Sequence, residues 1–322
     1  MNIIVESNIP YIKGLLEPWA SVSYVPASEI THAVVRDAQA LLVRTRTVCD
    51  RVLLEGSDVR FVGTATIGTD HIDLDYCRRR GIAVHNAPGC NAPAVAQWVH
   101  STIAQWMHMR GITSAQGLKL GVVGVGHVGS IVARWGSMLG FDVVLNDPPL
   151  GLNHAVDDCD IITFHTPLTR DTQWPTWHLC DEPMLQRATR CRLIINASRG
   201  GVCDDAALAQ WHGDVAIDCW EGEPHISHRL LNKAFVATPH IAGYSMQGKQ
   251  RGTAMVIDAL NRHFGFDAAV NMPQEPLLGA EQVSFQSITA SYTPVTDTTA
   301  LKQDPDSFEA LRNNYHLRNE VI

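Results

Sequence analysis

Short apolar runs, each followed by a stretch of helical periodicity, recur six times between residues 118 and 243, and this repetition is the strongest constraint on the fold. The runs are residues 120–123, 143–145, 161–164, 193–195, 215–217 and 235–237. Strands that alternate with helices pair in parallel, and six such strands with their crossovers make a complete dinucleotide-binding sheet. We therefore predict a doubly wound, Rossmann-type α/β domain over residues 93–247.

The first ninety residues show the same alternation. Their apolar runs, residues 3–5, 40–43, 61–63 and 83–85, predict a second parallel sheet. A long helical pattern then runs from Asn91 to Arg110, and another spans about residues 248–264. Because these helices can carry the chain out of the first domain and back, we predict that residues 1–92 and 248–266 form a flavodoxin-like α/β domain that binds the substrate.

The C-terminal region has a different character. A Ser/Thr-rich stretch through Thr299 predicts a linker and weak strands. After it, Asp306 and Glu309 form a capping pair ahead of an apolar stripe at helical spacing, which predicts a short helix. The stripe consists of Phe308, Leu311, Tyr315 and Ile322.

Charge and cysteine content exclude several classes of function. The chain has 25 basic and 33 acidic residues, a net charge of −8, and no block of like charges that would suit nucleic acid or a membrane surface. It has neither a signal-peptide pattern nor an apolar run long enough to span a bilayer, so we expect a soluble, cytoplasmic protein. Its eight cysteines include no Cys-x-x-Cys pair, so we expect reduced core thiols and no metal site.

A glycine-rich loop follows the first strand of the predicted Rossmann domain. It contains Gly124, Gly126, His127, Val128 and Gly129, and it opens a helix, so its backbone N–H groups can approach a pyrophosphate. Asp147 ends the next strand 18 residues after Gly129, where a carboxylate accepts hydrogen bonds from the ribose hydroxyls. Pro148 and Pro149 come next and offer no cation to a 2′-phosphate, so we predict NAD rather than NADP.

Four polar residues follow later strands of the same sheet. Arg199 follows the fourth strand, Asp218 ends the fifth with Glu223 in the loop beyond it, and His240 follows the sixth. All therefore emerge at the carboxyl edge, where parallel sheets bind ligands. We predict that His240 takes the proton of a substrate hydroxyl as hydride leaves the same carbon for NAD. Glu223 would stabilise the imidazolium, and Arg199 would bind the substrate carboxylate.

These motifs resemble those of the D-2-hydroxyacid dehydrogenase superfamily, and within it the erythronate-4-phosphate dehydrogenase family of pyridoxal 5′-phosphate biosynthesis. The resemblance covers residues 1 to about 265 and is carried by residues 61–66, 68–71, 87–92, 124–129, 196–200, 218–224, 239–244, 248–249 and 251–253. It implies oxidation of 4-phospho-D-erythronate with Arg199, Glu223 and His240 as catalytic residues. It also implies NAD contacts from Asp147, Thr166, Asp218, Gly243 and Tyr244, and substrate contacts from Thr45 and Thr66.

The sequence departs from that family at three places. Position 45 is Thr where the family usually has Ser, and the chain between Asp147 and Ile161 is shorter than the family norm. The family also carries a C-terminal dimerisation domain, which implies a homodimer. Here residues 267–322 resemble only a linker and part of that domain, because the strands expected after its helix are absent.

Two other functions remain open. One is a dehydrogenase or reductase for an unphosphorylated 2-hydroxy acid or for 3-phosphoglycerate. The other is a non-catalytic NAD-sensing protein like the C-terminal-binding-protein corepressors. Candidate ligands for a substrate phosphate are Arg44, Arg46, Lys249 and Arg251. Trp98, Trp106 and Met109 lie at helical spacing, and we interpret them as core residues rather than as a substrate box.

Overall fold

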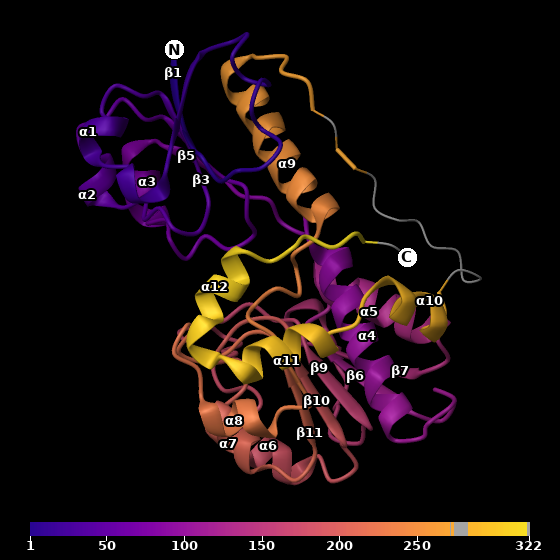
Figure 1. Cartoon of the computed structure of the whole chain (residues 1–322). Coiled ribbons are helices and arrows are strands. Elements are labelled where there is room, and N and C mark those ends of the chain that lie inside the picture. The colour runs from indigo at the N-terminus through magenta and orange to yellow at the C-terminus, as the bar shows by residue number, and fades with distance from the viewer. Residues whose placement is uncertain (271, 274–282, 321–322) are drawn as a thin grey trace. The chain divides into compact units, whose positions relative to one another are not determined.

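The computed structural model describes residues 1–270, 272–273 and 283–320, and the chain divides into two compact units. The first unit comprises Met1–Asn91 and Met246–Gln274, and the second comprises Ala92–Ser245 and Glu275–Ile322. The first unit is therefore discontinuous in sequence. Figure 1 shows the course of the chain, coloured from the N-terminus to the C-terminus.

The first unit is built on one parallel five-stranded sheet with the strand order β2-β1-β3-β4-β5. This strand order is the one found in flavodoxin-like proteins. The sequence predicts four of the five strands but misses the edge strand β2, because its exposed and half-buried residues give no apolar run. The strands are β1 (Asn2–Glu6), β2 (Ser21–Val25), β3 (Ala40–Val43), β4 (Phe61–Thr64) and β5 (Ala83–His85).

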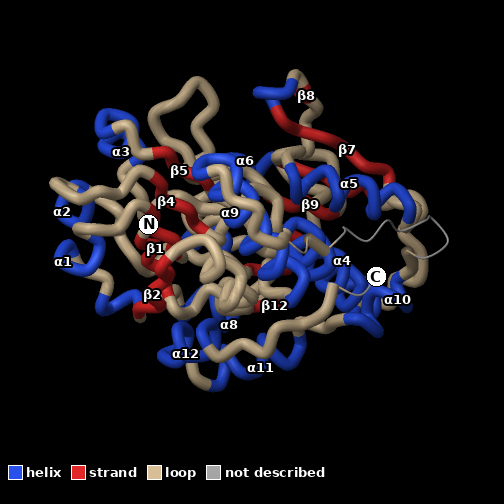
Figure 2. Tube along the Cα trace, turned by 90° about the horizontal axis from the view of Figure 1, so that it is seen from above, coloured by secondary structure: helices blue, strands red, loops and turns tan. Residues whose placement is uncertain are grey.

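Helices cover both faces of this sheet, as Figure 2 shows. One face packs against three short helices through a core that includes Val35, Leu54 and Cys77, and the other packs against α9 through Val256 and Leu260. The helices are α1 (His32–Val35), α2 (Arg51–Leu54), α3 (Leu74–Arg80) and α9 (Met246–Phe264). Both faces of the sheet are thereby buried, as a parallel sheet requires.

The second unit contains a seven-stranded sheet with the order β12-β11-β10-β9-β6-β7-β8. Six strands are parallel and match the predicted runs, and only β8 is antiparallel. The short stretch between Asp147 and Ile161 leaves room for a two-residue edge strand but not for a further parallel strand with its helix. The strands are β6 (Lys119–Val123), β7 (Asp142–Asp147), β8 (Leu152–Asn153), β9 (Ile161–Phe164), β10 (Leu193–Asn196), β11 (Asp214–Ile217) and β12 (Val236–Ala237).

Two hydrophobic cores lie on opposite faces of this sheet. The first contains Trp98, Trp106 and Trp135, which come from the two packed helices α4 (Ala92–Met109) and α5 (His127–Met138). The second packs under α6 (Glu182–Arg187), α7 (Asp205–Gln210) and α8 (His228–Lys233). The prediction that Trp98 and Trp106 are core residues is confirmed, but the prediction for Met109 is wrong, because it ends α4 and is 63% exposed.

The C-terminal region is helical where the sequence predicts a linker and weak strands. Its described part contains α10 (Phe285–Ser291), α11 (Val295–Gln303) and α12 (Phe308–Asn313). Ile288 of α10 joins the first core, while Leu301 and Phe308 join the second. Residues 283–320 thus pack onto the second unit rather than forming a separate region. Tertiary packing decides this outcome, because the isolated stretch has weak helical periodicity.

Details of this region also differ from the prediction. Ser307, rather than Asp306, precedes α12, and no side-chain cap is present there. The Thr298 hydroxyl of α11 accepts the N–H of Ala237 on the edge strand β12, so this part of the sheet edge is covered. Ile322, the last residue of the predicted apolar stripe, lies outside the described residues.

All eight cysteines are free and buried, which confirms the interpretation as core thiols. Among the described residues, no helix combines the length and apolar character needed to cross a bilayer.

Candidate active site

The glycine-rich loop has the geometry that a dinucleotide needs. A Cβ atom at Gly129 would lie 1.9 Å from the carbonyl oxygen of Gly124, so only glycine allows this close turn. A Cβ at Gly126 would meet nothing within 4 Å, which leaves open space beside the loop. Gly126 is also the N-cap of α5 and supplies no side-chain cap, so first-turn N–H groups of the helix remain available to an anion.

Asp147 and Thr166 flank this loop. An oxygen of the Asp147 carboxylate accepts the N–H of Val125 at 2.7 Å, which places the end of β7 against the loop. Thr166 packs against Gly124, since a Cβ there would lie 2.9 Å from its Cγ2. The Thr166 hydroxyl is buried and has no hydrogen-bond partner among the described residues. These features fit a bound NAD, with His127 and Val128 in the first turn of α5.

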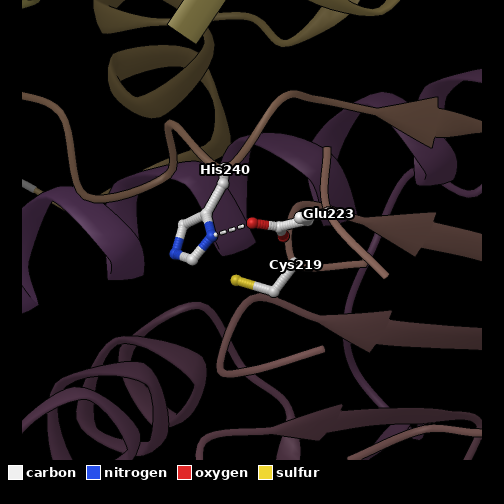
Figure 3. Close-up of side chains that lie close together, drawn as sticks. All are labelled: Cys219, Glu223 and His240. Atoms are coloured by element: carbon white, nitrogen blue, oxygen red, sulfur yellow. Dashed lines mark hydrogen bonds and ion pairs between the residues drawn. The ribbon is translucent and has the colours of Figure 1, made fainter. Parts of the chain in front are cut away.

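His240 and Glu223 form a hydrogen-bonded pair, shown in Figure 3. The Nδ1 atom of His240 lies 2.8 Å from Oε2 of Glu223, and the other carboxylate oxygen accepts the N–H of Trp220 at 2.8 Å. Both oxygens of Glu223 are therefore held in place. The paired Nδ1 leaves Nε2 as the nitrogen available for proton exchange with a substrate.

The Glu223 carboxylate is held in its charged form although it is mostly buried. Burial alone raises the pKa of a carboxyl group, but here the charge and hydrogen bond of His240 outweigh it. The N–H of Trp220 and the Arg312 guanidinium act in the same direction, so the net effect is a lowered pKa for Glu223. A charged carboxylate at Nδ1 is what a histidine needs when it accepts a proton at Nε2.

Arg199 follows a neighbouring strand of the same sheet, but among the described residues no hydrogen bond or ion pair joins it to Glu223 or His240. Its guanidinium donates to the carbonyl of Ser198 at 2.9 Å, and its charge partly opposes the rise in the pKa of the nearby Cys219 thiol that burial causes. Asn196 ties the Arg199 loop to the end of β11, because its amide donates to the carbonyls of Arg199 and Cys219. Gly200 permits the contact, since a Cβ there would lie 1.9 Å from the carbonyl oxygen of Trp220.

Asp218 has a structural function that the sequence does not reveal. Its two carboxylate oxygens accept the N–H groups of Ile241 and Ala242 at 2.8 and 3.0 Å, and one also accepts the Thr238 hydroxyl. Burial raises the pKa of Asp218, while His240 and these hydrogen bonds partly oppose that effect. Asp218 therefore organises the backbone that presents His240, and Gly243 lies in the turn that follows.

Two arginines of the C-terminal region also contact this site, and the sequence analysis does not assign them to it. Arg312 of α12 lies 4.0 Å from the Glu223 carboxylate and donates to the Tyr244 hydroxyl at 3.3 Å. Arg318 donates to carbonyl oxygens in the loop that carries His240. One sequence signal could have identified Arg312, because it lies four residues after Phe308, on the apolar side of its helix. Arg318 has no such local signal.

Cys219, Glu223 and His240 bring their ligand atoms within 4.8 Å of one another. Figure 3 shows the three side chains close together. Such a group can in principle hold a metal ion. However, burial raises the pKa of the Cys219 thiol well above its usual range, which disfavours the thiolate form that binds a metal. Nδ1 of His240 is also already bonded to Glu223. The arrangement therefore suits proton transfer better than metal binding.

The predicted substrate residues Thr45 and Thr66 belong to the first unit. They follow the neighbouring parallel strands β3 and β4, so both lie at the carboxyl edge of that sheet. Thr45 is exposed, whereas the Thr66 hydroxyl lies 2.7 Å from that of Thr64. Among the candidate phosphate ligands, Arg251 is only 4% exposed and donates to the carbonyl of Cys90 at 2.8 Å, which indicates a structural role for its Nε.

Comparison with known proteins gives consistent matches. The family model described as "D-isomer specific 2-hydroxyacid dehydrogenase, catalytic domain" matches residues 4–271. Erythronate-4-phosphate dehydrogenase of Bacteroides thetaiotaomicron is 41% identical over 99% of this chain and 97% of its own length. The same enzyme of Pseudomonas putida is 38% identical over 100% of this chain and 93% of its own length.

A likeness to solved structures supports the fold. D-lactate dehydrogenase from Aquifex aeolicus, solved with NAD and lactic acid, superposes with a TM-score of 0.63 at 21% identity. The match covers 82% of this chain and 96% of that one.

Proposed function

Because the chain belongs to the D-isomer specific 2-hydroxyacid dehydrogenase family, we propose that it oxidises 4-phospho-D-erythronate with NAD. The products would be (R)-3-hydroxy-2-oxo-4-phosphooxybutanoate, NADH and a proton. The observation that carries the chemistry is the His240–Glu223 pair at the carboxyl edge of the sheet that also carries the glycine loop. The phosphorylated four-carbon substrate rests on the names of the relatives at 37–43% identity.

In this proposal, His240 is the general base. Its Nε2 takes the proton of the substrate hydroxyl, while Glu223 at Nδ1 stabilises the imidazolium that forms. Arg199 binds the substrate carboxylate and orients C2. NAD, when bound, accepts the hydride from that carbon. The loop from Gly124 to Gly129 and Asp147 hold the cofactor, with Thr166, Asp218, Gly243 and Tyr244 nearby, and Thr45 and Thr66 bind the substrate.

The assembly and location of the protein are part of the same proposal. We propose a homodimer that works in the cytoplasm, and this proposal rests on the family resemblance of the sequence. Light scattering coupled to size-exclusion chromatography tests the dimer directly. A monomer mass at micromolar concentration would contradict it.

The experiment that tests the reaction is an assay of NADH formation with the purified protein. The substrates are 4-phospho-D-erythronate, 3-phosphoglycerate and D-lactate, and the proposal requires the highest kcat/KM for the first. A higher kcat/KM for 3-phosphoglycerate or D-lactate would identify that compound as the substrate instead. NADH binding without turnover of any 2-hydroxy acid would instead indicate an NAD-sensing binding protein.

A further inference from the structure

The backbone that presents His240 is held in an unfavourable conformation. We refer to Thr238–Ser245 as the His240 loop. His240 itself has a φ angle of +56°, in the left-handed region that non-glycine residues rarely adopt. Such a backbone conformation is unfavourable and persists only where the surrounding structure determines it. The contacts around the His240 loop must therefore supply that stabilisation.

One side of the loop is held by the carboxyl group and the backbone carbonyl of Asp218. Asp218 accepts the N–H groups of Ile241 and Ala242 through its carboxylate, and its backbone carbonyl accepts the N–H of His240 at 2.9 Å. Asp218 is 1% exposed, so water does not compete for these bonds. Asp218 binds N–H groups of the loop but not its carbonyl oxygens, so these need hydrogen-bond donors from another part of the chain.

The carbonyl side is held by a cation from the C-terminal region. Nη1 of Arg318 donates to the carbonyls of Ile241 and Tyr244 at 3.0 and 3.3 Å, and Nη2 donates to that of Ala242. Nη2 also donates to the carbonyl of Ala94 at 3.0 Å, at the start of α4. A single guanidinium thus joins three carbonyls of the His240 loop to the long helix of the second unit.

Arg318 is itself held firmly in position. Its Nε donates to the Gln97 side chain at 3.1 Å, and its guanidinium carbon lies 4.4 Å from the centre of the Tyr292 ring. Arg318 also pairs with Ser245 in an isolated parallel β-bridge. The Ser245 hydroxyl donates to the carboxylate of the neighbouring Glu320 at 2.5 Å. Bonding at both the side chain and the backbone makes this a rigid attachment.

We propose that Arg318 is a positioning residue for catalysis: by binding the carbonyls of the His240 loop, it holds His240 where its proton transfer is productive. This inference rests on the proposed dehydrogenase function. The C-terminal region would then serve the reaction within its own chain, whatever it contributes to a dimer. The five N–H donors of a guanidinium lie in one plane with fixed directions, and this is the geometry that several converging carbonyls require. A lysine ammonium cannot reproduce it.

The test uses the full-length variants Arg318→Ala and Arg318→Lys, with Lys302→Met as a matched control. Lys302 also ties the C-terminal region to the rest of the second unit, but its hydrogen bond goes to the carbonyl of Ala234, at 2.6 Å, and not to the His240 loop. Amide hydrogen exchange of peptides covering residues 238–245 reports on the loop, and steady-state kinetics reports on the reaction. Thermal melting of each variant reports on global stability.

We expect exchange in the His240 loop of Arg318→Ala to become about tenfold faster or more, since its carbonyl anchors are lost. We expect kcat to fall about 100-fold, as for other misplaced catalytic groups, while KM for the hydroxy acid changes little. Free guanidinium ion at a low, non-denaturing concentration should restore part of the turnover, because it can occupy the vacated position. A loss of global stability alone would not respond in this way. Lys302→Met should match the wild type.

Three outcomes would overturn the proposal. They are unchanged exchange in the His240 loop of Arg318→Ala, turnover close to the wild-type value, and full recovery of turnover in Arg318→Lys. If Arg318→Ala does not fold, Arg318→Lys provides the same comparison with a smaller change. The exchange measurement needs no turnover. If the wild-type protein oxidises no hydroxy acid, the proposed function fails, while exchange still decides whether Arg318 holds the loop.

Discussion

His240 and Glu223 contact each other through Nδ1 and Oε2 at 2.8 Å, although 17 residues separate them in sequence. The contact forms because β11 and β12 are neighbouring parallel strands, so the loops after them emerge at one edge of the sheet. The pairing orients the imidazole and places a negative charge on the side where an imidazolium needs it.

Replacing His240 by Asn should abolish most of the turnover without disturbing the fold. Asn tolerates the left-handed backbone conformation that His240 adopts, so the variant removes the base but adds little strain. Loss of a general base lowers kcat by about 10²–10⁴-fold. Stopped-flow or steady-state assays measure the effect, and NADH fluorescence should show cofactor binding near the wild-type level. Turnover close to that of the wild type would exclude His240 as the base.

Replacing Glu223 by Gln should move the acid limb of the kcat/KM profile for oxidation to lower pH. The amide carries no negative charge, so it does not stabilise the imidazolium that forms when His240 accepts the proton. The matched control is Glu221→Gln in the same loop, since Glu221 lies 3.3 Å from His178 instead. Equal profiles for wild type and Glu223→Gln would argue against the pairing role. A shift of the same size in the pH profile of Glu221→Gln would mean that the change arises from the loop as a whole rather than from the contact between Glu223 and His240.

Two glycine substitutions should distinguish an effect on stability from an effect on cofactor binding. Gly129→Ala places a Cβ 1.9 Å from the Gly124 carbonyl oxygen, so we expect a lower melting temperature. Gly126→Ala meets nothing within 4 Å and should melt like the wild type, yet bind NADH more weakly, because the methyl group occupies space beside the proposed pyrophosphate. Differential scanning fluorimetry and NADH titration measure both effects. Tight NADH binding by Gly126→Ala would place the pyrophosphate elsewhere.

Replacing Asp147 by Asn should reduce the preference for NAD over NADP. The amide oxygen can still accept the N–H of Val125, so the loop is retained, while the negative charge that would repel a 2′-phosphate is lost. We expect the ratio of kcat/KM values for the two cofactors to fall by about tenfold, equivalent to about 1.4 kcal/mol. An unchanged ratio would show that Asp147 does not face the adenosine ribose.

The protein should lose stability in acid because of two buried histidines. Burial lowers the pKa of His100 to about 4 and that of His165 to about 3, from the ordinary value of 6.5. Below pH 6.5 the unfolded chain therefore binds protons that the folded protein does not, and the free energy of unfolding decreases as pH falls toward 4.

The variant His100→Gln tests this origin of acid sensitivity. It should reduce the slope of unfolding free energy against pH by up to about 1.4 kcal/mol per pH unit in this window. Urea denaturation at a series of pH values measures the slope. An identical slope in the variant would mean that other groups cause the loss of stability.

The sequence alone predicts most of the central sheet of the second unit. The strands β6, β9 and β10 are continuous apolar runs buried on both faces, and such runs can be identified without tertiary information. The sequence does not predict the edge strands β2 and β8, because they are short and partly exposed. The sequence does not predict the helices α10 and α11 either, because their polar composition is typical of a linker. Only the folded structure shows that Ile288 and Leu301 are buried in the two cores of the second unit.

The sequence by itself determined the alternation of strands and helices, the glycine loop and the residues that reach the carboxyl edge of the sheet, because apolar periodicity and the special backbone needs of glycine are local properties. Only the tertiary structure decided that Asp218 holds loop amides, that His240 adopts a positive φ, and that Arg318 reaches the carbonyls of its loop. Those contacts join residues as many as 77 positions apart. The contacts of Arg318 also depend on how the C-terminal region packs, which no local pattern encodes.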